Sequence, residues 1–317
     1  MGEVARHTTG RLALALGLTL AFVVIEAVAG LWADSLALLT DAAHNLTDVA
    51  ALGLSWYALR LTGQPANSGK TFGYHRAGIL VAFINSTTLG LIAVGIFYEA
   101  YRRLLAPREV DSGLLVGVGL MALVLNAGTA WLVHRGSEHD LNLRSAYLHL
   151  LGDVLSTLGA VAAGVVIFFS GMNWLDPAVS LFIGALILWN AWGILREALD
   201  ILLEGTPRDI DMRRMVRDLL AVAGVRGVHD LHVWSITRSL RALSAHVVTD
   251  DIAVSAGAAI QRDINALLSH DYAIAHATLQ LECDGCEPDG LYCNISAAGH
   301  SQPHAAAPAE SPARQAS

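Results

Sequence analysis

Long stretches without a basic residue constrain this chain more than any other feature of its sequence. Residues 12–59, 77–101, 109–134 and 145–195 contain neither lysine nor arginine. An α-helix needs about 20 apolar residues to cross the hydrocarbon core of a bilayer. The first and last stretches are each long enough for a helical hairpin, and the middle two for one helix each. The pattern therefore predicts six membrane-spanning helices.

The composition agrees with a protein surrounded by lipid. Of the 317 residues, 54% are hydrophobic and 15% are charged, with a mean hydropathy of +0.49, whereas soluble domains carry about 25% charged residues. The start of the chain lacks the features of a cleaved signal peptide, so none is expected. The formal net charge of −8 is spread evenly, and nothing indicates nucleic-acid binding. We expect spans at residues 12–33, 38–61, 76–100, 112–135, 144–170 and 177–202.

An even number of spans places both termini on the same side of the membrane. Counting basic residues in the short flanks predicts that this side is the cytoplasm, although Arg102, Arg103 and Arg108 on the other side are an exception. The composition favours a bacterial inner membrane. The basic residues on the expected cytoplasmic side are Arg6, Arg11, Arg60, Lys70, Arg76, Arg135, Arg144 and Arg196.

The sequence changes character after Pro207. Helical periodicity over residues 209–223 and 254–269, and strand patterns at 228–236, 242–248 and 273–281, predict a small α+β domain with helices on one face of a sheet. We therefore expect four parts: a cytoplasmic segment 1–11, a six-helix transmembrane domain 12–206, a cytoplasmic metal-binding domain 207–283, and a disordered tail 284–317.

Ionisable side chains inside the expected spans are few, and four of them form two couples with the same spacing. His44 and Asp48 lie four residues apart in the second span, and His149 and Asp153 repeat this spacing in the fifth. Residues four apart share one face of a helix. Because charged groups are costly in hydrocarbon, such residues are candidates for function by default. Two facing helices would bring together two imidazoles and two carboxylates.

Two imidazoles and two carboxylates form a ligand set that a tetrahedral zinc ion accepts. The absence of a thiolate disfavours monovalent copper, and magnesium and calcium prefer all-oxygen shells. One such couple could equally be an interhelical hydrogen bond, but its recurrence favours a metal site. We expect a transporter of divalent metal, zinc before others, and not an enzyme. Two rivals are a membrane metallohydrolase, which needs an open coordination position and a nearby acid or base, and a zinc receptor that does not transport.

Other polar residues in the expected spans have more than one interpretation. Asp41, one turn before His44, is either an entrance residue for the ion or a helix-start cap. Glu26 is either part of a proton route or a partner for a neighbouring span. The amides are more typical of interhelical hydrogen bonds than of metal ligands, and they belong to Asn45, Asn85 and Asn126.

Four motifs resemble the cation diffusion facilitator family, on its zinc-transporting branch. They are SLALLTDAAHNLTD at residues 35–48, TFGYHR at 71–76, AYLHLLGD at 146–153 and VHDLHVW at 228–234. The resemblance covers residues from about 10 to 283. It implies a homodimer with six spans per subunit, a cytoplasmic ferredoxin-like domain, and exchange of zinc for protons.

The resemblance also implies roles for particular residues. His44, Asp48, His149 and Asp153 match the transport site. Some relatives have Asp in the place of His44 and also carry cadmium.

In the soluble domain, the positions that match cytoplasmic zinc ligands of related transporters are His229, His246, His276 and Glu282, whereas His232 matches no ligand. His75 matches a residue that joins a further site in some relatives. Cys283 and Cys286 form a Cys-x-x-Cys pair that could add thiolates near the dimer interface, a weak signal by itself.

Overall fold

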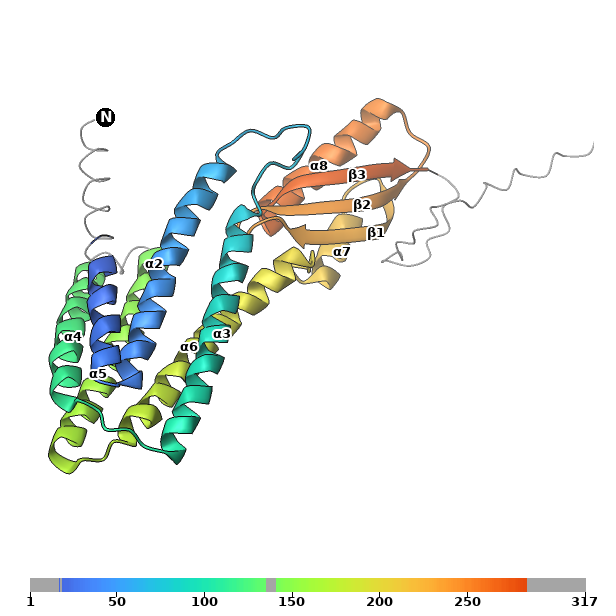
Figure 1. Cartoon of the computed structure of the whole chain (residues 1–317). Helices are drawn as coiled ribbons and strands as arrows, with labels where there is room; N and C mark the ends of the chain where they lie inside the picture. Colours follow the sequence, from blue (N-terminus) through green and yellow to red (C-terminus); the bar gives the residue numbers. More distant parts are fainter. Residues whose placement is uncertain (1–16, 18, 135–140, 284–317) are drawn as a thin grey trace, which may run out of the picture. The chain divides into compact units, whose positions relative to one another are not determined.

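The computed structural model describes residues 17, 19–134 and 141–283, without the side chains at 132, 133, 141–146, 148 and 149. The expected N-terminal segment 1–11 and tail 284–317 lie outside the described residues. The chain divides between Gly205 and Thr206 into two compact units (Figure 1). This division falls one residue before the domain boundary expected from the sequence.

The first unit is a bundle of long apolar helices. Four of the described helices, α3 to α6, are long and apolar enough to cross a membrane. In α2 the apolar sequence is interrupted by Asp41, Asp48 and Arg60. The bounds lie within several residues of the expected spans: an apolar helix Thr19–Trp32, then α2 (Leu36–Thr62), α3 (Ala77–Leu105), α4 (Ser112–His134), α5 (Leu141–Ser170) and α6 (Leu175–Leu202).

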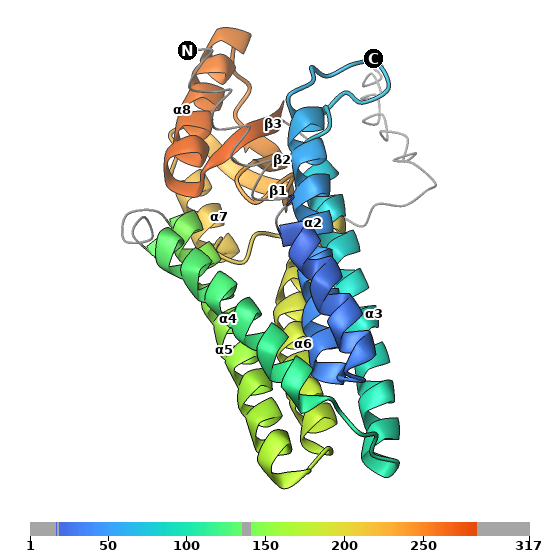
Figure 2. The same ribbon diagram turned by 60° about the vertical axis from the view of Figure 1, so that its left-hand side comes forward.

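Small residues let the helices of the bundle approach closely. α4 packs along α5, and α3 packs along α6. Figure 2 shows α4 and α5 side by side. A Cβ added to Gly164 on α5 would lie 2.9 Å from Val116 Cγ2 on α4, and one added to Gly119 on α4 would lie 2.8 Å from Val161 Cγ2 on α5. Only glycine fits at these two contacts, which are typical of helix pairs in membranes.

The outer surface of the bundle is apolar. The side chains of Trp32, Phe169 and Trp189 are each about four-fifths exposed. Such large hydrophobic residues would be costly in water but are stable against lipid tails. The polar residues, in contrast, are among the most buried: Glu26, Ser35, Thr40 and Asp176 have no exposed surface.

The second unit is an α+β domain with the element order predicted from the sequence. Its sheet has the order β1-β2-β3, with β1 and β2 antiparallel and β2 and β3 parallel. The parallel pair requires a crossover, which α8 supplies. The elements are α7 (Met212–Leu220), β1 (Val225–Ser235), β2 (Arg241–Thr249), α8 (Val254–Tyr272) and β3 (Ile274–Glu282).

One core holds this domain together. Met215 and Leu219 of α7 and Ile264 and Leu268 of α8 are buried together with Leu243 of β2 and its alternate neighbours. Because side chains alternate along a strand, the other face of β2 carries the partly exposed residues Ser244, His246 and Val248. Both helices therefore cover one face of the sheet, and the opposite face is left for polar side chains.

Candidate metal-binding sites

The start of α2 is held by a carboxylate that comes from a distant part of the chain. Asp176 on α6 accepts hydrogen bonds from Ser35 Oγ at 2.6 Å, Leu36 N at 2.6 Å and Ala37 N at 3.2 Å. Ser35 Oγ in turn accepts from Leu38 N at 3.3 Å. The first backbone N–H groups of a helix have no partner within the helix, so these contacts satisfy them at a place where Ser35 and Asp176 are fully buried. They fix the helix that carries two of the candidate metal ligands.

His44 lies between two carboxylates, one from its own helix and one from α5. Its Nε2 is 3.5 Å from Asp48 Oδ2 on the next turn of α2 and 3.3 Å from Asp153 Oδ1 on α5. The side chains of His44 and Asp153 are almost buried, and that of Asp48 is one-third exposed. α2 and α5 thus turn an imidazole and two carboxylates toward one another inside the bundle.

The fourth expected ligand of this site is His149. It lies in α5 one turn before Asp153, so the backbone places it on the same helix face. Its side chain lies outside the described residues.

Several further polar groups surround the three described side chains. The hydroxyl of Thr157 is 3.4 Å from Asp41 Oδ2 and 2.8 Å from the backbone oxygen of Asp153. The same hydroxyl accepts a hydrogen bond from Asn126 Nδ2 at 3.2 Å, and Asn45 Nδ2 donates to Glu26 Oε2 at 3.2 Å. The sequence interpretation of these asparagines as interhelical hydrogen-bonding residues agrees with both contacts. Asp41 lies in the second turn of α2 and does not cap its start, where Ser35 is the cap.

The soluble domain contains a compact group of three candidate ligands on the open face of its sheet. His229 of β1 is paired with His246 of β2, and their rings lie 5.0 Å apart at 73°. Glu282 at the end of β3 lies opposite Val248, two residues along from His246. Residues paired across strands project to the same face. The sheet register therefore brings these three side chains together.

The glutamate of this group contacts both histidines. Its Oε2 is 3.0 Å from His229 Nε2, and its Oε1 is 2.8 Å from His246 Nδ1. One ligand atom from each residue lies within 4.8 Å of the other two, and among the described residues this is the one group of three or more His, Cys, Asp or Glu that does so. The donors in the membrane unit form a more open arrangement, in which His44 contacts both carboxylates.

A β-bulge places a further carboxylate beside the group. The pairing of β1 with β2 shifts by one residue between His229 and His232, and Asp230 in the bulge has a φ of 48°. Asp230 Oδ1 lies 3.0 Å from His232 Nε2, and Oδ2 lies 3.5 Å from His246 Nε2. Carboxylates in this position orient metal-binding histidines in many proteins.

The structure does not bring every expected ligand of the soluble domain to this place. His276 is exposed on β3 and is paired with Ala242, six residues along the strand from Glu282. At about 3.3 Å per residue it lies near the opposite end of the sheet. Cys283 follows Glu282 directly and is an exposed free thiol. Cys286 lies outside the described residues.

Comparison with known families decides what kind of protein carries these two sites. A model of the cation efflux transmembrane domain matches residues 12–203, and a model of the cation efflux protein cytoplasmic domain matches residues 207–284. The chain belongs to the cation efflux family. This is the cation diffusion facilitator family that the motifs resemble, and this cation efflux protein is a multi-pass membrane protein.

Curated relatives span nearly the whole of this cation efflux protein. The zinc transporter ZitB of Escherichia coli is 37% identical over 93% of this chain and 94% of its own length. The cadmium, cobalt and zinc/H(+)-K(+) antiporter of Bacillus subtilis is 39% identical over 84% of this chain and 87% of its own. A solved structure, the metal-bound C-terminal domain of the CzcD transporter from Cupriavidus metallidurans, is 33% identical over 23% of this chain and 99% of its own, with a TM-score of 0.22.

Sequence reasoning missed three residues that shape the sites of this cation efflux protein: Asp176, Thr157 and Asp230. Thr157 carries a recognisable signal, because it lies four residues after Asp153 and so on the same helix face. Asp176 and Asp230 carry none, since their partners are set by packing and by a bulge.

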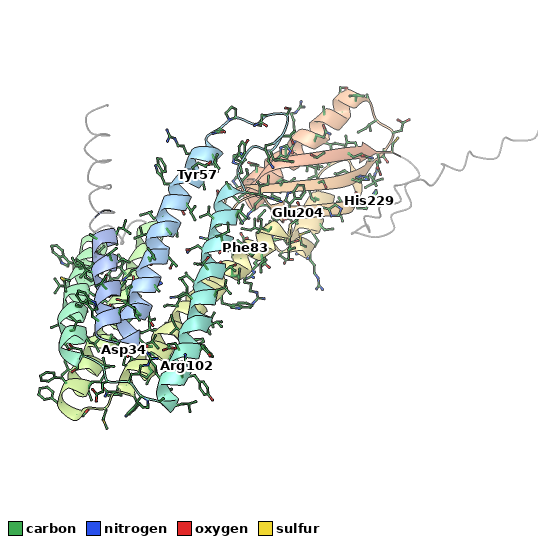
Figure 3. The ribbon with its side chains drawn as sticks, viewed as in Figure 1. Asp34, Tyr57, Phe83, Arg102, Glu204 and His229 are labelled. Atoms are coloured by element: carbon green, nitrogen blue, oxygen red, sulfur yellow. The ribbon has the colours of Figure 1, made fainter. Side chains whose placement is uncertain are left out.

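The structure also gives a reason for the arginines that break the charge rule. Arg103 is almost buried and contacts Asp34 Oδ1 at 2.7 Å and Glu99 Oε1 at 3.0 Å. Arg102 lies 3.6 Å from Glu99 Oε2, and Arg108 lies 3.4 Å from Asp34 Oδ1. Figure 3 shows Asp34 and Arg102 near the same end of the bundle. Arg103 and Arg108 tie the connection after the first helix to the end of α3, and Arg102 pairs with Glu99 within α3, so each arginine has a structural partner.

His75 stands apart from the other candidates. It is exposed in the turn that precedes α3 and does not belong to the three-donor group of His229, His246 and Glu282.

Proposed function

We propose that this protein exports divalent metal, zinc before others, from the cytoplasm in exchange for protons. The observation that carries the proposal is the position of His44, whose Nε2 lies 3.3 Å from a carboxylate of α5 and 3.5 Å from one of α2. Two helices thus offer an imidazole and two carboxylates to one ion, and His149 would complete a four-ligand set. The names of the relatives, which are zinc transporters and cadmium, cobalt and zinc antiporters, support this cargo.

Protons and metal would compete for the same lone pairs. Imidazole has an unperturbed pKa of about 6.5, and metal binding requires the neutral ring and the ionised carboxylate. Zinc would bind from the cytoplasm, protons from the other side would displace it, and the bundle would open to the two sides alternately. We propose six spans, both termini in the cytoplasm and a bacterial inner membrane, as the distribution of basic residues favours.

The soluble domain would bind zinc as a resident ion. His229, His246 and Glu282 supply three of the nitrogen and oxygen donors that zinc prefers, and Asp230 would hold the ring of His246 in place. Cys283 and Cys286, His276 and His75 remain candidates for ligands that a homodimer would complete. The cytoplasmic domain family of the second unit supports a dimer.

Metal flux in proteoliposomes tests the transport proposal. Replacing Asp153 with Ala should abolish zinc-driven proton movement, while Asp111→Ala, at an exposed helix start, should leave it unchanged. Transport retained by Asp153→Ala would refute the assignment. The same assay excludes a receptor and a metallohydrolase, since neither moves zinc against a gradient. His44→Asp should increase cadmium transport relative to zinc.

A further inference from the structure

The membrane unit holds a second group of buried carboxyls, apart from the proposed metal ligands. Glu26 on the helix Thr19–Trp32 has no exposed surface, and Asp41 on α2 is 4% exposed. The two carboxyl groups lie within hydrogen-bonding range of each other. Oε2 of Glu26 accepts from Asn45 Nδ2, whereas Oε1 has no donor among the residues that the structure describes.

Such a pair must hold a proton. Two carboxylates in contact and shielded from water repel each other strongly, so one of them stays protonated. A proton on the pair would also provide a hydrogen-bond donor beside Glu26, whose Oε1 lacks one among the described residues. A structural partner for Asn45 would need only an amide or a hydroxyl. The two acids can therefore take up and release a proton, an ability that the fold itself does not require.

The neighbours of the pair connect it to the metal site. The described titratable groups around it are His44 on α2 and Asp153 on α5, and both act on Asp41 through their charges. α4 contributes Asn126 and α5 contributes Thr157, neither of which titrates near neutral pH, and Thr157 contacts Asp41 and the backbone of Asp153. No lysine or arginine occurs between residues 12 and 59. The protein thus places little positive charge near Glu26 and Asp41, and a cation bound at the metal site would add it.

We propose that the Glu26–Asp41 pair is a proton-binding site distinct from the metal ligands, and that it loses its proton when a divalent cation binds at His44, Asp48 and Asp153. The proposal rests on the metal site proposed above. The two positive charges of the cation offset the second carboxylate charge, the O–H bond of the pair breaks, and the proton passes to water. When the cation leaves, the repulsion between the carboxylates returns and the pair takes up a proton again.

Counting protons during zinc binding tests this site. Full-length protein in nanodiscs, with His229→Ala and His246→Ala to silence the soluble site, is titrated with zinc by calorimetry in buffers of different ionisation enthalpy. Glu26→Gln keeps the size and polarity of the side chain, so it should still bind zinc but release about one proton fewer per ion. Glu26→Asp, which keeps a carboxyl group, should restore the release. Glu109→Gln, at an exposed position in the loop before α4, should behave like the parent protein.

The outcome that overturns the proposal is an unchanged number of released protons. Asp41→Asn provides a second, independent variant if Glu26→Gln does not fold, and it should also release about one proton fewer per ion. The parent protein carrying Asp153→Ala separates this proposal from the one on which it rests. Zinc binding that survives Asp153→Ala refutes the metal site itself, whereas binding that requires Asp153 together with an unchanged proton count in Glu26→Gln refutes the proton site alone.

Discussion

Asp176→Ala should be among the most destabilising single substitutions in the membrane unit. The carboxylate accepts three hydrogen bonds, from Ser35 Oγ, Leu36 N and Ala37 N, at 2.6, 2.6 and 3.2 Å, and it has no exposed surface. Alanine would leave three buried donors without an acceptor. Each unsatisfied donor costs about 1–3 kcal/mol, and release of the buried charge from its desolvation offsets part of the sum, so we expect a loss of about 3–6 kcal/mol.

Thermal unfolding of the purified protein in detergent, followed by tryptophan fluorescence, measures this loss. At about 2–4 °C per kcal/mol, Asp176→Ala should lower the apparent midpoint by on the order of 10 °C. Asp176→Asn keeps one acceptor oxygen and should lie between Asp176→Ala and the parent. Asp111→Ala is a matched control, because the exposed Asp111 caps the start of α4 by accepting one hydrogen bond from Leu114 N. Its loss should cost only about 1 kcal/mol. A midpoint for Asp176→Ala no lower than that of Asp111→Ala would show that the Asp176 carboxylate does not stabilise the start of α2.

Three further predictions concern packing, a buried phenol and the soluble metal site. Gly164→Ala should destabilise the bundle by about 1–3 kcal/mol, because the added Cβ would lie 2.9 Å from a side chain of α4. Gly159→Ala, on the same helix, would place its Cβ in open space and should be tolerated in the same thermal assay. Burial and the hydrogen bond to Asp218 at 2.6 Å raise the pKa of Tyr272 to about 12. The contribution of the protonated phenol to folding stability should therefore be complete below about pH 10 and be lost as the pH rises through 12. An absorbance titration of wild type minus Tyr272→Phe should show one phenol with this raised pKa. Zinc should raise the unfolding midpoint of the soluble domain, and His246→Ala should abolish that rise because it removes one of the proposed ligands.

The positions of the helices along the sequence were predictable because the bilayer imposes a length on each of them. Gaps without lysine or arginine placed the helices of the membrane unit to within several residues, and the i, i+4 spacing placed His44 and Asp48 on one face of α2. The contact between Ser35 and Asp176 joins residues 141 positions apart. No local pattern encodes it, since the need for an acceptor at the start of α2 arises only once that helix end is buried.

In the soluble domain, the order of the elements followed from periodicity, but the site depends on register. The pairing of His229 with His246, and the position of Glu282 opposite Val248, are set by how the strands align. A bulge at Asp230, which adopts a left-handed φ of 48°, directs that carboxylate toward His232 and His246. Such a shift has no reliable sequence signal, because Asp tolerates this conformation without requiring it.

X-ray absorption spectroscopy of zinc bound in the membrane unit tests whether His44, Asp48 and Asp153 form a metal site. The full-length protein with His229→Ala, His246→Ala, Glu282→Gln, Cys283→Ser and Cys286→Ser, which lacks the candidate ligands after β2 except His276, would be loaded with zinc in nanodiscs. We expect one zinc per chain, bound only by nitrogen and oxygen at about 2.0–2.2 Å with the signature of imidazole, and no zinc after the further change Asp153→Ala. Sulfur ligands in the spectrum, or the same zinc content with and without Asp153, would contradict this expectation.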